Sequence, residues 1–184
     1  MLSPEKLAKM IDHTNVKPNA TQNDIKRLCC EAAEYGFSTA CITPVNAAYA
    51  SQLLKGSGVG VCVVVGFPLG TSKTETKAFE TEAAVADGAT DIDMVMNVGA
   101  LKSEQYSMVE EDIKSVVDAA DGTPVKVIIE TALLSDSEKV KACSIAEKAG
   151  AKFIKTSTGV GYPGATVEDV KTTTDEEKES KEII

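Results

Sequence analysis

Apolar and polar positions along the chain follow two alternating patterns, which predict strands and helices in turn. Short runs dense in Val, Ile and Cys have the composition of buried strands, and the segments between them repeat apolar residues at helical spacing. The predicted strands are residues 10–16, 38–44, 60–68, 91–98, 125–131 and 153–158. The predicted helices are residues 4–10, 21–35, 46–54, 74–87, 103–120 and 135–149, the first opened by Ser3 as N-cap and by Pro4.

This alternation predicts a parallel sheet covered by helices. Nearly continuous Val/Ile strands joined by helical crossovers are typical of α/β proteins with both faces of the sheet buried. Two architectures satisfy the pattern, a doubly wound sheet and a (β/α) barrel.

Polar residues inside the strands favour the barrel. Side chains alternate between the two faces of a strand, so Asp93 lies on the face opposite Met94. By the same count Lys126 shares a face with Glu130, and Lys155 lies on one face of the last strand. In a barrel these charged side chains converge on one lumen, whereas an open sheet spreads them under its helices. The predicted fold is therefore α/β, a parallel (β/α) TIM-type barrel with its catalytic end at the strand C-termini.

Lys155, in the segment "FIKTSTG", is the most informative of these residues. Burial of an ammonium group is costly unless the group is paired or loses its proton. A second cation such as Lys126, together with desolvation, would lower the Lys155 pKa and leave a neutral nucleophile. Such an amine forms an imine with an aldehyde or ketone, and Asp93 would help to move the protons. An internal ion-pair network with a purely structural role is the alternative.

Length, charge and cysteine pattern narrow the class of protein. With 184 residues, 43% of them hydrophobic, the chain has the size of one domain with a substantial core. Its formal net charge of -9 argues against nucleic acid and anionic membranes as partners, because both are bound mainly through Lys and Arg. The longest apolar run, residues 59–67, is far shorter than a membrane span of roughly 20 residues. The cysteines show no zinc-type or C-x-x-C spacing, so we expect reduced thiols, no metal site and a cytoplasmic protein.

Six segments follow one another along the chain: "IDHTNVKPNAT" (11–21), "ACITPVNAAYA" (40–50), "VVVGFPLGTSKTETK" (63–77), "GATDIDMVMNVGALK" (88–102), "VKVIIETALL" (125–134) and "AGAKFIKTSTGVGYPGATVEDV" (149–170). Together they resemble the deoxyribose-phosphate aldolases of the DeoC family. The resemblance implies an imine-forming class I aldolase on a (β/α)8 barrel. Its expected reaction is the reversible cleavage of 2-deoxy-D-ribose 5-phosphate to D-glyceraldehyde 3-phosphate and acetaldehyde, with no metal or organic cofactor.

The same resemblance implies roles for individual residues by motif position. Lys155 would form the Schiff base, Asp93 would act in proton transfer, and Lys126 would be a neighbouring active-site lysine. The implied substrate-binding residues are Asp12, Thr14, Cys41, Thr158 and Gly159, the last through its backbone N–H.

Simpler roles stay open for three of these residues. Asp12 can serve as a cap, Thr14 can hydrogen-bond to the backbone, and Cys41 can be a small core residue. His13, the only histidine, lies on the face opposite Asp12 by strand alternation, so we do not expect it to be the general base.

The last segment departs from the family pattern. Family members continue with two further strands, which carry a second relay lysine and most phosphate ligands, whereas residues 171–184 have a charged sequence without a strand pattern. We therefore expect an incomplete barrel domain over residues 1–170, with about six of eight strands, and a charged tail or helix extension over residues 171–184.

An incomplete barrel has consequences for association and activity. Unpaired sheet edges favour pairing with another chain, so a homo-oligomer or a strand-completing partner is expected. Loss of phosphate ligands would reduce activity. The alternatives are a catalytically silent barrel fragment that acts through another chain, and a different imine-forming barrel aldolase.

Overall fold

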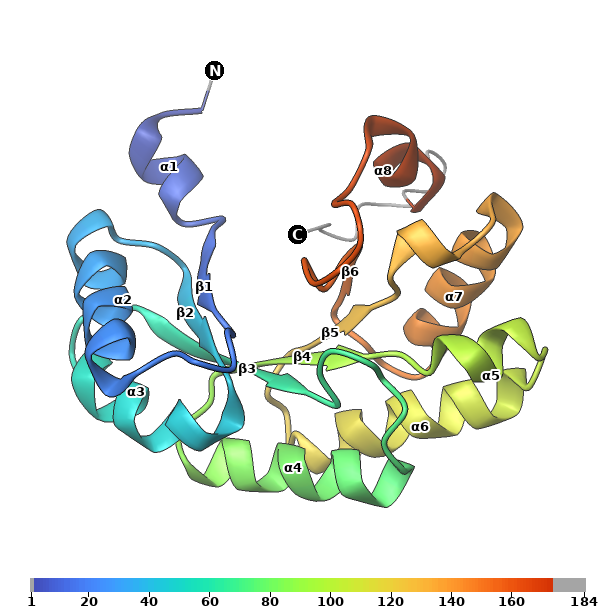
Figure 1. The fold of residues 1–184 in the computed structure, drawn as a ribbon, viewed down its shortest axis with the longest axis horizontal. Coiled ribbons are helices and arrows are strands. Elements are labelled where there is room, and N and C mark those ends of the chain that lie inside the picture. Colours follow the sequence, from blue (N-terminus) through green and yellow to red (C-terminus); the bar gives the residue numbers. More distant parts are fainter. Residues whose placement is uncertain (1, 174–184) are drawn as a thin grey trace.

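The computed structural model describes residues 2–173, which form a curled parallel sheet with helices along its outer side (Figure 1). The strands are β1 (Asp12–Asn15), β2 (Thr39–Ile42), β3 (Gly60–Val65), β4 (Asp91–Val95), β5 (Val125–Ile128) and β6 (Phe153–Lys155). They pair in the order β1-β2-β3-β4-β5-β6, so strands adjacent in sequence are adjacent in the sheet. A doubly wound sheet would reverse its strand order at a switch point. The described residues therefore form a half-barrel, which confirms the predicted TIM-type architecture.

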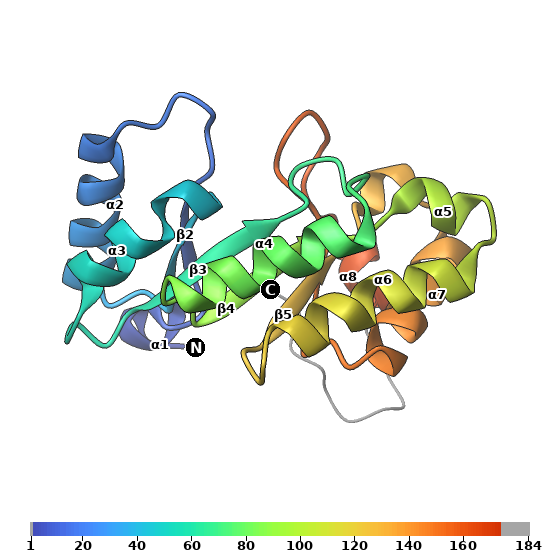
Figure 2. The same cartoon turned by 90° about the horizontal axis from the view of Figure 1, so that it is seen from below.

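Helices connect the successive strands. They are α2 (Gln22–Tyr35), α3 (Ala47–Leu54), α4 (Thr74–Ala86), α6 (Tyr106–Ala119) and α7 (Asp136–Lys148). Shorter elements are α1 (Pro4–Ala8), α5 (Val98–Lys102), α8 (Val167–Thr173) and the 3-10 turns η1 (Pro44–Asn46) and η2 (Thr131–Leu133). Figure 2, which views the molecule from below, shows α4 and α6 side by side in front of the sheet, where they pack against each other.

Local signals in the sequence set several helix ends. Thr21 and Asp24 form a capping box at the start of α2, and Ser135 and Glu138 form another at the start of α7. Helix α2 ends at Gly36, whose φ of 67° is a left-handed conformation that glycine adopts without strain. These signals explain why the predicted starts of both helices and the predicted end of α2 agree with the structure to within one residue.

The two faces of the sheet carry different side chains. The outer face and the helices share a large aliphatic core that includes Ile92 and Met94 of β4. The inner face holds a small apolar cluster of Cys41, Cys62 and Val64 beside charged residues. Strand alternation therefore places Asp93, Lys126 and Lys155 on the inner face, as predicted.

Two predicted elements have different limits in the structure. The helix expected over residues 103–120 is α6, which starts at Tyr106, and the short helix α5 before it was not predicted; the Asn97 side chain caps α5 by accepting the Ala100 N–H at 3.0 Å. The strand expected over residues 125–131 ends at Ile128, and Glu130 has a left-handed backbone with φ 53° and ψ 68°. Glu130 therefore does not continue the alternation that was predicted to place it on the face of Lys126.

The predicted domain limit at residue 170 lies within α8, so residues 171–173 are its last turn. The rest of the predicted charged tail, residues 174–184, lies outside the described residues. The division of the chain at this point stays a prediction. None of the described helices combines the length and apolarity that a membrane crossing requires.

Candidate active site

The centre of the inner face is the carboxylate of Asp93, which is fully buried on β4. Strand register brings its partners to it, because Asp93 is paired with Lys126 of β5 and Lys155 follows on β6, opposite Ile128. Lys126 Nζ lies 3.1 Å from Asp93 Oδ1, and Lys155 Nζ contacts Asp93 Oδ2. One carboxylate therefore binds two ammonium groups, one on each oxygen.

Lys126 lies at the centre of a wider cluster. Its Nζ is 3.3 Å from Asp12 Oδ2, 3.2 Å from Asp91 Oδ1 and 3.6 Å from Cys62 Sγ. Its side chain is 2% exposed, whereas that of Lys155 is 20% exposed. Of the two amines, Lys155 is the one that a small molecule can reach.

The protonation of these groups differs from the sequence-based prediction. Burial alone would lower the pKa of Lys155, but the Asp93 carboxylate outweighs it and the net pKa is raised. The pKa of Lys126 is raised as well, because nearby anionic groups, Asp93 and Asp12 among them, outweigh its desolvation. The predicted lowering of the Lys155 pKa is therefore wrong for this arrangement, because the attraction of the shared Asp93 carboxylate outweighs desolvation. Lys155 rests as an ammonium ion.

The pKa values of Asp93 and Asp91 are shifted in opposite directions. Burial alone would raise the Asp93 pKa, but Lys155 and Lys126 outweigh it and the net pKa is lowered. Asp91 has a raised pKa because its desolvation outweighs the attraction of Lys126. Asp93 is thus held as a carboxylate, in direct contact with the proton-carrying amine of Lys155.

The predicted substrate-binding residues fall into two groups. Asp12 and Cys41 belong to the buried cluster, with Asp12 Oδ2 4.0 Å from Lys155 Nζ. Thr14, Thr158 and Gly159 lie at the rim, where they line one pocket of about 680 Å³. The pocket opens between the β1 edge, α2 and the loop after β6, and none of Lys155, Asp93 or Lys126 lines it. Proximity to the amine therefore supports a substrate-binding role for Asp12 and Cys41 more strongly than it supports that role for the rim residues.

The simpler role of Thr14 is visible as well, because Thr14 Oγ1 donates to the Asp12 carbonyl at 2.7 Å. Asp12 Oδ1 accepts from Thr39 Oγ1 of the neighbouring strand at 2.6 Å, which is not the cap that was the alternative for Asp12. His13 Nε2 lies 2.7 Å from Glu31 Oε2 of α2, on the outer side of β1. The predicted outward orientation of His13 is therefore confirmed.

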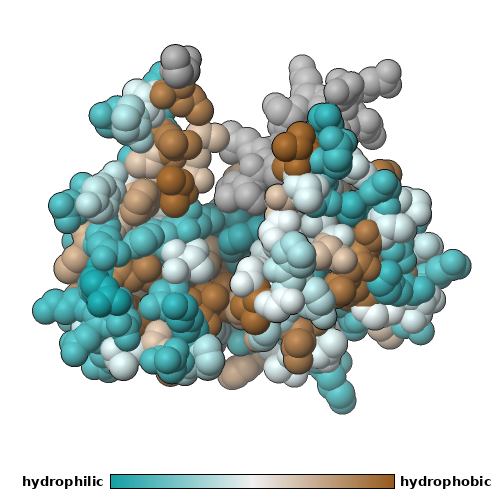
Figure 3. Space-filling model, turned by 45° about the horizontal axis from the view of Figure 1, so that its top comes forward, coloured by the Kyte–Doolittle hydropathy of each residue, from teal (hydrophilic) through white to brown (hydrophobic). Residues whose placement is uncertain are grey.

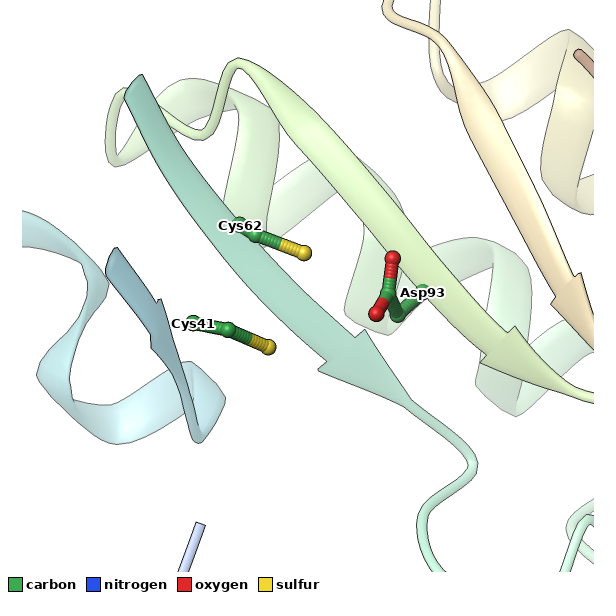
Figure 4. Close-up of side chains that lie close together, drawn as sticks. All are labelled: Cys41, Cys62 and Asp93. Atoms are coloured by element: carbon green, nitrogen blue, oxygen red, sulfur yellow. The ribbon is translucent and has the colours of Figure 1, made fainter. Parts of the chain in front are cut away.

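Three side chains could present ligands to a metal ion. Cys41 and Cys62, on neighbouring strands, point with Asp93 into the same space (Figure 4), and their ligand atoms lie within 4.8 Å of one another. However, two ammonium groups already contact Asp93, and burial raises the Cys62 thiol pKa well above its ordinary value. A cation would have to displace both lysines and deprotonate a buried thiol. This donor set is poorly suited to a metal.

Sequence reasoning did not assign site roles to three residues that the structure brings close. Asp91 and Cys62 contact Lys126, and Glu130 contacts the loop that carries Thr158. Asp91 lies two residues before Asp93 and so shares its face of the strand, and Cys62 is the register partner of Cys41, so the sheet pattern contains a signal for both. No pattern in the sequence indicates the contact of Glu130, because it depends on a left-handed backbone.

The amino-acid sequence matches the model of the DeoC/LacD family of aldolases over residues 6–184. The chain belongs to this family. It is 58% identical over 171 residues to a deoxyribose-phosphate aldolase of Clostridium perfringens (strain SM101 / Type A), with 92% of this chain and 76% of that protein covered. It is 56% identical over 172 residues to a deoxyribose-phosphate aldolase of Aciduliprofundum boonei, with 92% of this chain and 78% of that protein covered.

Solved structures agree with the DeoC/LacD assignment. The deoxyribose phosphate aldolase from Aeropyrum pernix, described as having a unique tetrameric structure, superposes with a TM-score of 0.86 at 37% identity. The superposition covers 93% of this chain and 72% of that one. None of the comparisons favours reduced activity, the silent fragment or another kind of imine-forming aldolase. The family establishes the chain as an aldolase, a carbon–carbon lyase.

Proposed function

We propose that the chain catalyses the reversible cleavage of 2-deoxy-D-ribose 5-phosphate to D-glyceraldehyde 3-phosphate and acetaldehyde through an imine on Lys155. The observation that carries the proposal is the contact of a partly accessible amine, Lys155, with a fully buried carboxylate, Asp93. The relatives named deoxyribose-phosphate aldolase supply the substrate, and the cluster supplies groups suited to the chemistry.

Imine formation begins with transfer of a proton from the Lys155 ammonium ion. Asp93 accepts this proton, and the neutral amine attacks the aldehyde carbon of the open-chain sugar. The carbonyl oxygen takes up a proton to give a carbinolamine, which loses water to form the protonated imine. Lys126 stays charged throughout, because several anionic groups surround it. Its positive charge favours the carboxylate form of Asp93, so Asp93 can release the proton again.

Cleavage then breaks the bond between C2 and C3 of the sugar. A base removes the proton of the C3 hydroxyl group, D-glyceraldehyde 3-phosphate leaves, and the bonding electrons form an enamine between C1, C2 and the Lys155 nitrogen. Protonation at C2 regenerates an imine, whose hydrolysis releases acetaldehyde and the free lysine. Asp93 contacts Lys155, Asp12 Oδ2 lies 4.0 Å from Lys155 Nζ, and Asp91 contacts Lys126, so these carboxylates are the candidates for carrying both protons.

Borohydride trapping tests the proposal. The chain is incubated with acetaldehyde or with deoxyribose 5-phosphate, reduced, and weighed by mass spectrometry with peptide mapping. We expect an ethyl group on Lys155 and elimination of the adduct in Lys155→Leu. The matched control is Lys152→Leu, which removes an exposed lysine just before the same strand and should leave the adduct unchanged. An unmodified Lys155 in the wild-type chain would refute the imine mechanism.

We also propose that the protein is a cytoplasmic homo-oligomer. A structural relative is described as tetrameric. Apolar side chains gather on and beside α1, where Leu2, Leu7 and Met10 are more than half exposed, and brown atoms mark this region at the upper left of Figure 3. Exposed apolar surface of this kind favours association with a second copy. Light scattering of the purified chain measures its mass directly, and a strand-completing partner remains the alternative if the chain is monomeric.

A further inference from the structure

Glu130 combines three unusual properties at the C-terminal end of β5. Glu130 is 3% exposed, its backbone is left-handed with φ 53°, and its Oε1 has no hydrogen-bond partner among the described residues. Each property is unfavourable for a glutamate, because a buried charge needs partners and a side chain strains a left-handed backbone. Strain held at the mouth of a barrel points to a function that compensates for it.

Both hydrogen bonds of the Glu130 carboxylate lead to the loop after the proposed imine lysine. Glu130 Oε2 accepts the Thr158 backbone N–H at 3.2 Å and also the Thr158 hydroxyl group. The Thr158 Oγ1 in turn accepts the Val160 N–H at 3.2 Å. Gly159 lies between these two bonds with φ 73°, so the carboxylate fixes the turn on both sides of Gly159.

The neighbours of Glu130 tie the same two segments together. The Ile129 N–H donates to the Lys155 carbonyl at 3.0 Å, and the Thr131 N–H donates to the Thr156 carbonyl at 2.8 Å. The backbone beyond β5 thus runs alongside residues 155–158 and brings the Glu130 carboxylate under Thr158. The left-handed conformation is what allows the side chain of Glu130 to reach this position between two backbone bonds.

We propose that Glu130 is a positioning residue that sets the turn from Thr158 to Val160 for binding the part of the substrate remote from its carbonyl. This inference rests on the proposed function, since it takes Thr158 and Gly159 as substrate-binding residues. Lys155 holds the C1 end of the sugar, so a turn three residues further along the loop meets the hydroxyl and phosphate end. Glu130 itself touches neither, and it acts through the hydroxyl and N–H groups that it orders.

The test compares substrate binding with imine formation in Glu130→Ala. We expect KM for deoxyribose 5-phosphate to rise about tenfold or more, the equivalent of one lost hydrogen bond to a charged group. Trapping of acetaldehyde on Lys155 should continue at the wild-type rate, because acetaldehyde lacks the remote groups. Glu130→Gln should recover most of the loss, since its amide oxygen can accept both Thr158 bonds.

Backbone strain is separated from the carboxylate contact by a pair of glycine variants. Glu104 also has a left-handed backbone, with φ 56°, in the exposed loop between α5 and α6. Glu104→Gly and Glu130→Gly both relieve a strained backbone, but only Glu130→Gly removes the contact with Thr158. We expect a raised KM in Glu130→Gly alone.

Three outcomes would overturn the proposal: a wild-type KM in Glu130→Ala, equal losses of trapping and turnover, or a raised KM in Glu104→Gly. Hydrogen exchange gives a readout that does not depend on catalysis. The Thr158 and Val160 amides should exchange faster in Glu130→Ala than in the wild-type chain. If the wild-type chain formed no imine, the proposed function would fail, whereas protection of these amides by Glu130 would still be measured.

Discussion

Lysines lie on both sides of the sheet, Lys77 on the outer side and Lys126 with Lys155 on the inner face, and their surroundings differ. Lys77 of α4 is fully buried on the outer side, where its Nζ lies 2.6 Å from Asp112 Oδ2 and 3.0 Å from the Val95 carbonyl. Asp112 accepts a further bond from the Thr74 hydroxyl group at 3.0 Å. This site contains one positive and one negative charge, each with additional polar contacts. It connects α4, α6 and β4 and is closed to solvent.

The inner-face site is neither paired one to one nor closed. Lys126 and Lys155 share Asp93, and Asp12 and Asp91 add two more carboxylates around Lys126. Asp12 Oδ2 is buried and makes no hydrogen bond in the described part of the chain, although Lys126 attracts it from 3.3 Å. The Lys155 side chain is 20% exposed.

The comparison shows that burial of a lysine does not by itself indicate catalysis. Lys77 and Asp112 pair one to one and are closed to solvent, so no small molecule can reach them. In the inner cluster one carboxylate faces two ammonium groups, so a proton can leave Lys155 while Lys126 continues to compensate the charge nearby. Shared partners and access for a small molecule distinguish the catalytic candidate from the structural pair.

Asp93→Asn and Asp112→Asn should differ most strongly in their effect on the rate of cleavage. We expect Asp93→Asn to lower the rate of deoxyribose 5-phosphate cleavage by on the order of 10²–10⁴-fold, because it removes the proton acceptor. Asp112→Asn should leave kcat of the folded protein near the wild-type value. Comparable losses of kcat in both variants would mean that the inner cluster has only a structural role.

Removal of the outer pair gives the next largest effect, on stability. Asp112→Asn leaves the Lys77 ammonium ion buried without its counter-charge and should cost about 3–5 kcal/mol of unfolding free energy, measured in urea. The double variant Lys77→Met/Asp112→Leu replaces the pair by apolar side chains and should recover most of that loss. A double variant as unstable as the single one would show that the pair contributes more than charge compensation.

Lys126→Met tests how Lys126 affects the pKa of Lys155. Without Lys126, Asp93 interacts with Lys155 alone, so the Lys155 pKa should rise further. The pH profile for trapping acetaldehyde should move to more alkaline values, with the rate at neutral pH falling about tenfold per unit of that shift. The sequence-based prediction, in which Lys126 chiefly repels a proton from Lys155, gives the same direction. An unchanged profile would contradict both.

The inner cluster was accessible to prediction because it depends on strand alternation. Asp93, Lys126 and Lys155 follow a period of two within apolar strands, and parallel register then brings them together. Their protonation was not accessible, because the sequence does not show that the two lysines share one carboxylate. The distances that decide this balance arise only once β4, β5 and β6 are adjacent.

The fold shows the same division between local and non-local information. The limits of α2 and α7 agree with prediction, because each helix begins at its own capping box. The predicted end of β5 lies three residues beyond the observed end at Ile128. Glu130 has a left-handed backbone, and the sequence has no glycine or asparagine at this position to indicate it. Bonds from residues 129 and 131 to the β6 loop stabilise that conformation, and these partners are distant in sequence.

Asp169→Asn should give the smallest effect, because this ion pair lies outside the sheet. Lys139 Nζ of α7 lies 2.8 Å from Asp169 Oδ1, and Thr166 donates to Oδ2 from its N–H and hydroxyl groups. The hydrogen bond from Lys139, with those from Thr166, lowers the pKa of Asp169 to about 2. Because the folded pKa is the lower one, this stabilisation is present above the ordinary pKa of 3.8 and is lost as the pH falls through about 2.

At neutral pH the Asp169→Asn variant should therefore lose about 1 kcal/mol or less of unfolding free energy. The difference from the wild-type chain should decrease between pH 4 and pH 2, where the wild-type carboxylate becomes protonated. Trapping on Lys155 should not change, because Asp169 connects α7 to α8 and is not part of the inner cluster. If Asp169→Asn slowed trapping as much as Lys126→Met does, ion pairs throughout the molecule would influence Lys155, and proximity to Asp93 would no longer identify the residues that control its proton.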